Sequence, residues 1–248
     1  MALRPLPVRG LQARSPGPKC AVIFHPFPQL SPVPQASSAS LPIGDQTVKR
    51  PRLVGSVYDL SGTTQLPYTS PRPYPAGSSR TLTFFEMTPR TEGTEYASRL
   101  TSPQDPASAT MTRLIWEPDR VVLASIDFTF VVATFNCTFS PPLEIVPLPI
   151  RAGDLPAQSA SGPQCRGTAQ VTVMDEEPLS AAGRQWDTWK MHTVITYQAQ
   201  TSLEVTVDTT SWFSPELGVP VATKETQTGN VGGATFSSEL ATRLSTLP

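Results

Sequence analysis

The sequence predicts a mainly β protein, built as a curled antiparallel meander (half-barrel or barrel-like) with a disordered, proline-rich N-terminal arm. From residue 80 onward the apolar side chains recur mainly with a period of two, which is the period of a strand. The candidate strands are joined by short turns, which favours antiparallel neighbours over a parallel α/β sheet. No helical periodicity indicates a layer of helices over a flat sheet. The sheet must therefore curl on itself, pair with a second sheet or be covered by loops.

The first 75 residues differ from the rest of the chain in proline content and charge. They hold 14 of the 28 prolines and eight basic side chains against two acidic ones, whereas residues 76–248 hold 11 basic and 18 acidic side chains. Proline removes a backbone donor and fixes φ, so this density argues against helices and central strands. We therefore divide the chain into a basic disordered arm over residues 1–75 and an antiparallel β domain over residues 76–248.

The arm suggests one kind of partner, and the composition argues against another. A proline-rich basic segment can recruit proteins with aromatic grooves, and Lys49-Arg50-Pro51-Arg52 is either a basic address signal or ordinary arm charge. The whole chain has a net charge of −1 and a pI near 6.1, so we expect no nucleic-acid partner. No apolar window reaches the length of a transmembrane helix, and no secretory signal is readable in the first thirty residues.

In the β domain, alternating apolar and polar residues predict the strands in order along the chain: residues 82–87, 112–117, 120–126, 127–139, 167–174, 189–197, 203–207 and 219–226. Their half-polar character fits an antiparallel sheet with one face in water. Residues 140–164 are rich in proline and apolar side chains, and we expect them to form a loop that packs over the body. Residues 237–240 are expected to begin a short terminal helix.

Four motifs in the body resemble those of a group of known proteins. In chain order they are Pro141-Pro142-Leu143 with Pro147-Leu148-Pro149, Gly153-Asp154, Trp186-Asp187-Thr188-Trp189, and Trp212-Phe213-Ser214-Pro215-Glu216-Leu217-Gly218-Val219-Pro220-Val221. Over residues 80–248 this pattern resembles uncharacterised exported β-rich proteins of high-GC bacteria. Their curled sheet is similar to domains of unknown function in the outer-membrane lipoprotein carrier superfamily. The resemblance implies an extracytoplasmic or cell-surface location, and it transfers no functional residues.

The cysteines and a histidine are candidates for chemistry. Cys137 and Cys165 flank the proline-rich segment, and in an exported protein they can form a disulfide that closes it. The alternative is unpaired thiols, with Cys20 left over in the arm in either case. His192 has Asp208 and several hydroxyl groups nearby in sequence, so a hydrolase with an unrecognised site is one alternative function. The sequence carries no zinc spacing and no dinucleotide or phosphate loop, and we expect no metal and no cofactor.

Aromatic side chains supply the remaining clue. Five of them are expected to line the concave face of the sheet as ligand-binding residues: Trp116, Phe128, Phe130, Trp189 and Phe213. They form either a plain hydrophobic core or the wall of an apolar cavity such as large barrels and half-barrels use to hold ligands. We expect a non-enzymatic exported or cell-surface domain that binds an apolar, lipid-like small molecule or a protein partner in its curled sheet. A scaffold that acts through the arm and the hydrolase are the alternatives.

Overall fold

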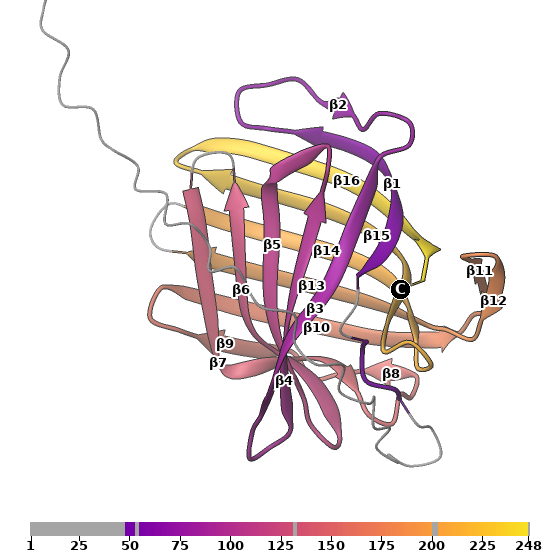
Figure 1. Ribbon diagram of the computed structural model, residues 1–248. Coiled ribbons are helices and arrows are strands. Elements are labelled where there is room, and N and C mark those ends of the chain that lie inside the picture. Colours follow the sequence, from indigo (N-terminus) through magenta and orange to yellow (C-terminus); the bar gives the residue numbers. More distant parts are fainter. Residues whose placement is uncertain (1–47, 53–54, 131–132, 200–202, 248) are drawn as a thin grey trace, which may run out of the picture. The chain divides into compact units, whose positions relative to one another are not determined.

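The structure, a computed structural model, describes residues 48–52, 55–130, 133–199 and 203–247 (Figure 1). Within these ranges every regular element is a β-strand. Twelve strands pair in one continuous order, and each strand is antiparallel to its neighbours. The predicted fold class, a curled antiparallel half-barrel, is confirmed. Most of the predicted arm, residues 1–47, lies outside the described residues.

The sheet consists of two runs of strands that meet at its middle. The first run, from the sheet edge inward, is β7 (Ala133–Pro147), β6 (Arg120–Phe130), β5 (Asp105–Trp116), β4 (Thr94–Ser102), β3 (Ser79–Pro89) and β1 (Ser56–Gln65). The second run continues with β16 (Ala234–Thr246), β15 (Val219–Val231), β14 (Leu203–Ser214), β13 (Trp189–Ala199), β10 (Cys165–Glu176) and β8 (Gly153–Asp154). In Figure 1 the indigo and magenta strands of the first run cross in front of the orange and yellow strands of the second.

Four short strands complete the structure. The strand β2 (Arg72–Pro73) pairs with β1, and β9 (Gln158–Ser161) pairs with β10. The strands β11 (Leu179–Ala181) and β12 (Arg184–Trp186) form a separate hairpin. This hairpin packs its indole, Trp186, with Tyr58, Val221 and Leu244. It is therefore attached where β1, β15 and β16 meet.

Strand register determines which side chains face into the curl, because directly paired residues of antiparallel strands share a face. Two large clusters of buried residues lie on this inward face. The first, here called the aromatic cluster, includes Phe84, Tyr96, Trp116, Met191 and Phe213. The second, the seam cluster, is formed by residues of β7, β9, β10, β13, β14 and their neighbours, including Cys137, Phe139, Leu143, Ala160 and Cys165.

The predicted boundary at residue 75 is wrong, because the sheet begins earlier. The strand β1 covers residues 56–65 and pairs with β3 on one side and β16 on the other. Its side chains alternate between buried Tyr58 and Leu60 and exposed Asp59 and Ser61. The alternation covers few residues and lies among prolines. The proline content of the segment therefore favoured a disordered arm over a strand. Residues 48–52 also contact the body, since Val48 and Pro51 are buried.

Three other expectations need correction. Residues 140–164 are not one covering loop: β7 continues to Pro147, and β8 and β9 follow. Prolines are tolerated in β7 because it is the edge strand of the paired order. Residues 127–139 divide between β6 and β7. The terminal helix is instead β16, in which Phe236, Ser238 and Leu240 are all buried on one face.

Candidate functional site

The inside of the half-barrel is apolar but not sealed. Leu82 and Leu100 are directly paired, and Leu114 is paired with Tyr96, so all of them face inward. On the other run, Ile195 is paired with Val207. All five aliphatic side chains stay only partly buried although they point into the curl. A fully filled core would enclose such side chains, since protein interiors are close-packed.

Polar groups also face the interior. Glu225 is paired with the buried Leu240 and so shares its inward face. Burial raises the pKa of the Glu225 carboxyl, and the charge of Arg80 partly offsets this rise. Thr223 and Thr242 face the same side and their hydroxyl oxygens lie 2.7 Å apart. The interior can therefore take a ligand that is mainly, but not wholly, apolar.

The five predicted ligand-binding aromatics are only partly brought together. Trp116 and Phe213 are buried in the aromatic cluster, and the partly buried Trp189 packs against it directly opposite Phe213. Phe128 and Phe130 are on β6, but their side chains lie outside the described residues. The line between Phe84, Tyr96 and Trp116 is made of edge-to-face contacts, with ring centroids 6.5 Å and 6.4 Å apart. Phe84, at one end of this row of rings, also lines a pocket that the sequence analysis did not predict.

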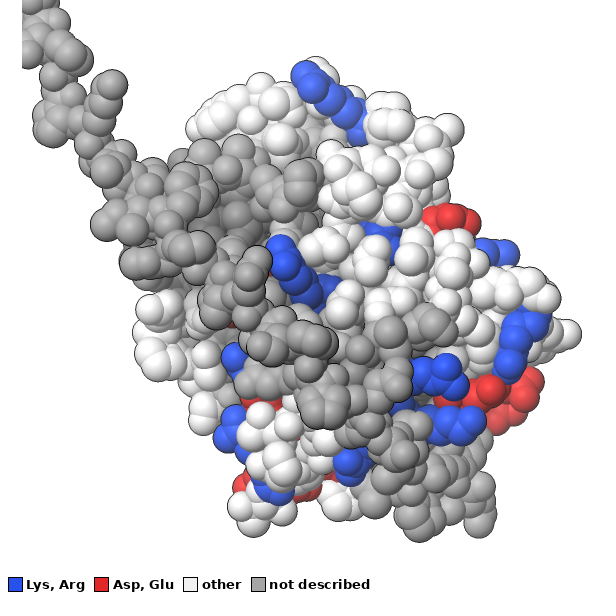
Figure 2. Space-filling view, viewed as in Figure 1, with Lys and Arg blue, Asp and Glu red and all other residues white. Residues whose placement is uncertain are grey.

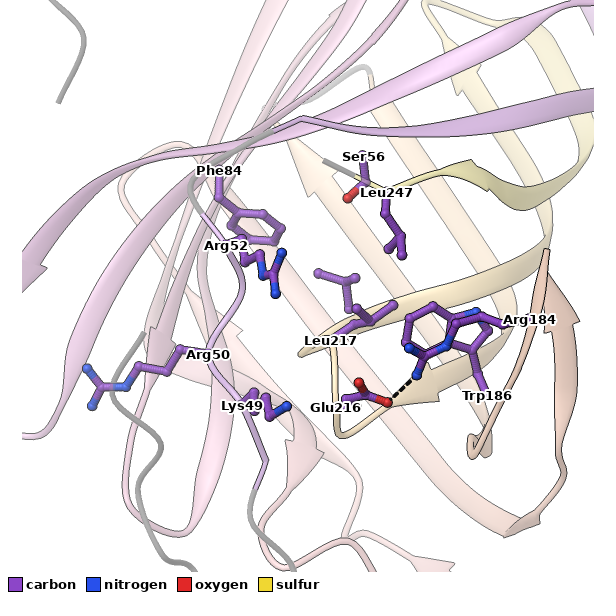
Figure 3. A pocket seen from close by; sticks show the side chains of 11 residues that line it. Lys49, Arg50, Arg52, Ser56, Phe84, Arg184, Trp186, Glu216, Leu217 and Leu247 are labelled. Atoms are coloured by element: carbon purple, nitrogen blue, oxygen red, sulfur yellow. Dashed lines mark hydrogen bonds and ion pairs between the residues drawn. The ribbon is translucent and has the colours of Figure 1, made fainter. Parts of the chain in front are cut away.

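That pocket, here called the cationic pocket, has a volume of about 210 Å³ (Figure 3). It lies between residues 49–52, the turn after β14, the β11–β12 hairpin and the end of β16. The residues that line it are Lys49, Arg50, Arg52, Ser56, Phe84, Arg184, Trp186, Glu216, Leu217, Val219 and Leu247. Four of these are basic and one is acidic. Figure 2, drawn from the side used in Figure 1, shows basic side chains widely spread on this face and acidic ones at fewer points.

One wall of the pocket is the turn whose residues the sequence singled out. The N–H groups of Leu217 and Gly218 donate to the carbonyl oxygen of Ser214, which closes the turn. Gly218 has φ of 68°, and a Cβ there would lie 2.2 Å from the carbonyl oxygen of Lys49. Only glycine meets both conditions without strain. The Lys49 N–H in turn donates to the Pro215 carbonyl at 2.8 Å, so the turn fixes residues 48–52 against the body.

Next to this turn, the β11–β12 hairpin holds an arginine in a fixed position. The guanidinium of Arg184 lies 3.5 Å from the centroid of the Trp186 ring and donates to Glu216 Oε2 at 2.5 Å. Trp186 is itself held by a bond from its Nε1 to the Ala181 carbonyl at 3.0 Å. By contrast, Lys49 and Arg52 have no acidic partner among the residues that the structure describes. The pocket therefore keeps an excess of positive charge.

The two body cysteines lie together, as the sequence analysis required for a disulfide. Cys137 on β7 and Cys165 on β10 are both buried in the seam cluster and both are free thiols. Burial raises the pKa of Cys137, and its hydrogen bond with Cys165 raises it further. Burial also raises the pKa of Cys165, while the same bond lowers it. Two buried neutral thiols in contact are inert until they are oxidised, and the disulfide itself stays a prediction.

His192 faces away from the interior. Its Nε2 lies 2.8 Å from Asp208 Oδ1 on the outer face of β13 and β14, where Asp208 is exposed and His192 is partly exposed. No group of three or more His, Cys, Asp or Glu residues capable of holding a metal occurs in the described part of the chain. Among the same residues, no helix has the length and apolar character needed to cross a membrane.

Comparison with known proteins gives little further information. No protein-family model matches the chain, and no curated protein matches it. A similar solved structure is that of a candidate lipoprotein from Parabacteroides distasonis ATCC 8503, with 12% identical residues and a TM-score of 0.40. The match covers 78% of this chain and 95% of that one. A likeness of this degree does not indicate a shared ligand or function.

Proposed function

We propose that this protein is a non-enzymatic binding domain that takes up an apolar, lipid-like ligand in its curled sheet. One observation carries the proposal: inward-facing aliphatic side chains of both strand runs keep partial exposure. Apolar surface that stays accessible inside a concave sheet is stabilised by an apolar guest, at roughly 25 cal/mol for each Å² removed from water. A protein partner in the same concave face is the alternative occupant.

The proposal also places the protein outside the cytoplasm or on the cell surface. Support comes from the motif resemblance together with the two thiols in contact at Cys137 and Cys165, which in an oxidising compartment can become a structural disulfide. A carrier or surface receptor for apolar molecules would work in such a compartment. The mass of the protein isolated from its native source tests this point, because a disulfide lowers it by two hydrogens.

The binding proposal is tested with the full-length chain. We expect native mass spectra to show bound species of lipid size that denaturing spectra lack. Leu114 packs against both the aromatic and the seam clusters, so Leu114→Trp should fill the interior and abolish the bound species. Met174→Trp is the matched control. Met174 is 44% exposed, and the preceding residue on β10, Val173, is buried, so Met174 faces away from the interior. Bare protein in every spectrum, together with no uptake of added amphiphiles, would reject the proposal.

A further inference from the structure

We propose that the cationic pocket binds an oxyanion, the phosphate or carboxylate head group of the ligand whose apolar part lies in the curled sheet. This inference rests on the proposed function and adds the chemical class of the ligand: an anionic amphiphile. Three features of the pocket carry it, namely its unpaired cations, its apolar floor and its size.

The first feature is the unpaired positive charge of the pocket. The side chains of Lys49, Arg52 and Arg184 all reach toward the same space (Figure 3). Glu216 compensates only Arg184, at 2.5 Å. Arg50 also lines the pocket, but its guanidinium points away from this space (Figure 3) and donates to Thr94 Oγ1 at 2.9 Å, while its Nε is buried without a hydrogen-bond partner. Oxyanions are the ligands that arginine and lysine bind most strongly, through charge-assisted hydrogen bonds.

The floor of the pocket is apolar and continuous with the interior. Phe84 and Val219 line the pocket and are also buried members of the aromatic cluster. Leu217 lines the pocket and packs against the same cluster. A ligand held by its charged end among the cations would therefore place the atoms next to that end on Phe84. Phe84 in turn contacts the buried Tyr96 ring, which contacts Trp116, so the floor belongs to the apolar interior.

The size of the pocket fits a head group. A volume of about 210 Å³ is below the roughly 300–1,000 Å³ of pockets that enclose a whole drug-sized ligand. A phosphate or carboxylate with its first few neighbouring atoms fits such a space, whereas a long acyl chain does not. The apolar remainder must then extend into the half-barrel, which is the division that an amphiphile needs.

The experiment compares three probes on the full-length chain by titration calorimetry: decyl phosphate, 1-decanol and inorganic phosphate. Decyl phosphate and decanol share the chain and differ in charge, and inorganic phosphate has the charge without the chain. We expect decyl phosphate to bind at least about ten-fold more tightly than either, since a charge-assisted hydrogen bond contributes more than the factor of ten that about 1.4 kcal/mol represents.

Variants locate the effect. The double variant Lys49→Gln/Arg52→Gln should weaken decyl phosphate by about ten-fold or more and leave decanol unchanged. Both side chains are without ion-pair partners among the described residues, so the fold should tolerate the change. The control Arg72→Gln/Arg166→Gln removes the same charge from exposed positions on β2 and β10 and should bind decyl phosphate as the wild type does.

The outcomes separate this inference from the proposed function. Equal affinity for decanol and decyl phosphate, or no effect of the Lys49/Arg52 double variant, would overturn the inference and leave the apolar site standing. Inorganic phosphate bound as tightly as decyl phosphate, and weakened alike by the double variant, would assign the pocket to free oxyanions and overturn the link to an amphiphile. Failure of both chain-bearing probes to bind would overturn the proposed function as well.

Discussion

The two strand runs of the half-barrel meet in two places, and they are held together differently at each. At the junction, β1 and β16 pair through nine residues, from Val57 opposite Thr246 to Gln65 opposite Ser237. At the seam, β7 lies against β9 and β10. Among the strand pairings of the described residues, none joins β7 to either of them. One side of the molecule is closed by a backbone ladder and the other by side chains.

A glutamine replaces the missing ladder at the seam. The Glu144 N–H donates to Gln158 Oε1 at 2.7 Å, and Gln158 Nε2 donates to the Glu144 carbonyl at 3.1 Å. The side-chain amide thus satisfies a backbone donor and acceptor of β7 as a neighbouring strand would. Below it the seam cluster packs β7 on β10. A ladder breaks cooperatively, whereas a side-chain closure can open locally, so we expect the seam to open more readily than the junction.

The largest expected effect comes from a matched pair of glycines. A Cβ on Gly62 would lie 1.9 Å from the Glu239 carbonyl at the junction, and one on Gly162 would lie 1.9 Å from the Thr138 carbonyl at the seam. Gly62 also has φ of 127°. We expect Gly62→Ala to lower the free energy of unfolding by at least about 3 kcal/mol, and Gly162→Ala by about half as much because the seam can move apart.

Urea unfolding of the full chain measures both changes. Gly77→Ala is the control for backbone conformation alone, since Gly77 has φ of 78° and a Cβ there would meet nothing within 4 Å. Equal losses at Gly62 and Gly162 would show that the seam is as rigid as the junction. The argued difference between the two closures would then be wrong.

The next effect sharpens the comparison by making the seam covalent. Added during refolding from urea, when both thiols are accessible, oxidised glutathione should convert the Cys137 and Cys165 thiols into a disulfide by exchange, with two glutathione thiols released. Because the bond joins β7 to β10 where no ladder does, we expect the free energy of unfolding to rise by about 3 kcal/mol. Denaturation midpoints with and without reductant measure the gain, and Cys137→Ser should remove it. Cys137 and Cys165 thiols that stay reduced in excess oxidised glutathione would contradict the geometry.

A smaller loss of stability is expected when the side-chain amide of Gln158 is removed from the seam. Gln158→Ala leaves the Glu144 N–H and carbonyl without partners, which should cost about 1–2 kcal/mol. Hydrogen exchange is the sharper measurement, because the Glu144 amide should exchange faster while the β1 amides do not. Gln170→Ala removes an exposed glutamine from β10 and serves as the control. Unchanged exchange at Glu144 would mean that packing alone closes the seam.

Local sequence patterns predicted strands such as β10, which has one exposed face, but missed β4, in which residues 94–98 are buried on both faces. In β10, buried Val171 and Val173 alternate with more exposed neighbours, so the period of two is visible in the sequence. In β4, Glu95 and Ala97 are as buried as Tyr96, so no alternation marks the strand. In β16, a run of serines before Glu239 favours a helix start locally, but pairing on both sides imposes a strand.

The cationic pocket was harder to predict than the fold. The turn at residues 214–220 was identified from its glycine and prolines, because turn residues act locally. Lys49 and Arg52 were read as arm charge, and nothing near them in sequence points to Arg184 or Trp186. These residues meet only through the long-range pairing of β1 with β16 and the docking of the β11–β12 hairpin. A basic cluster directly before an alternating strand was the one available signal.

The smallest expected effect is on the pH dependence of stability. It compares two carboxylates, one beside the junction and one at the seam. Burial raises the pKa of Glu225, which faces the interior beside the junction, and of Glu144 at the seam. A carboxyl whose folded-state pKa is raised binds protons more readily in the folded than in the unfolded state. Its contribution to stability is therefore greatest below the unfolded value of about 4.3 and falls as the pH rises through the folded value.

Glu225→Gln should therefore gain stability relative to the wild type as the pH rises from about 4 to 7, by less than about 1 kcal/mol. Glu144→Gln should gain less if the seam opens locally and hydrates Glu144, whereas Glu225 lies beside the backbone ladder of the junction. Urea midpoints across this pH range measure both, with Glu239→Gln as the exposed charge control on β16. A larger gain at Glu144 than at Glu225 would place the tighter closure at the seam and reverse the comparison.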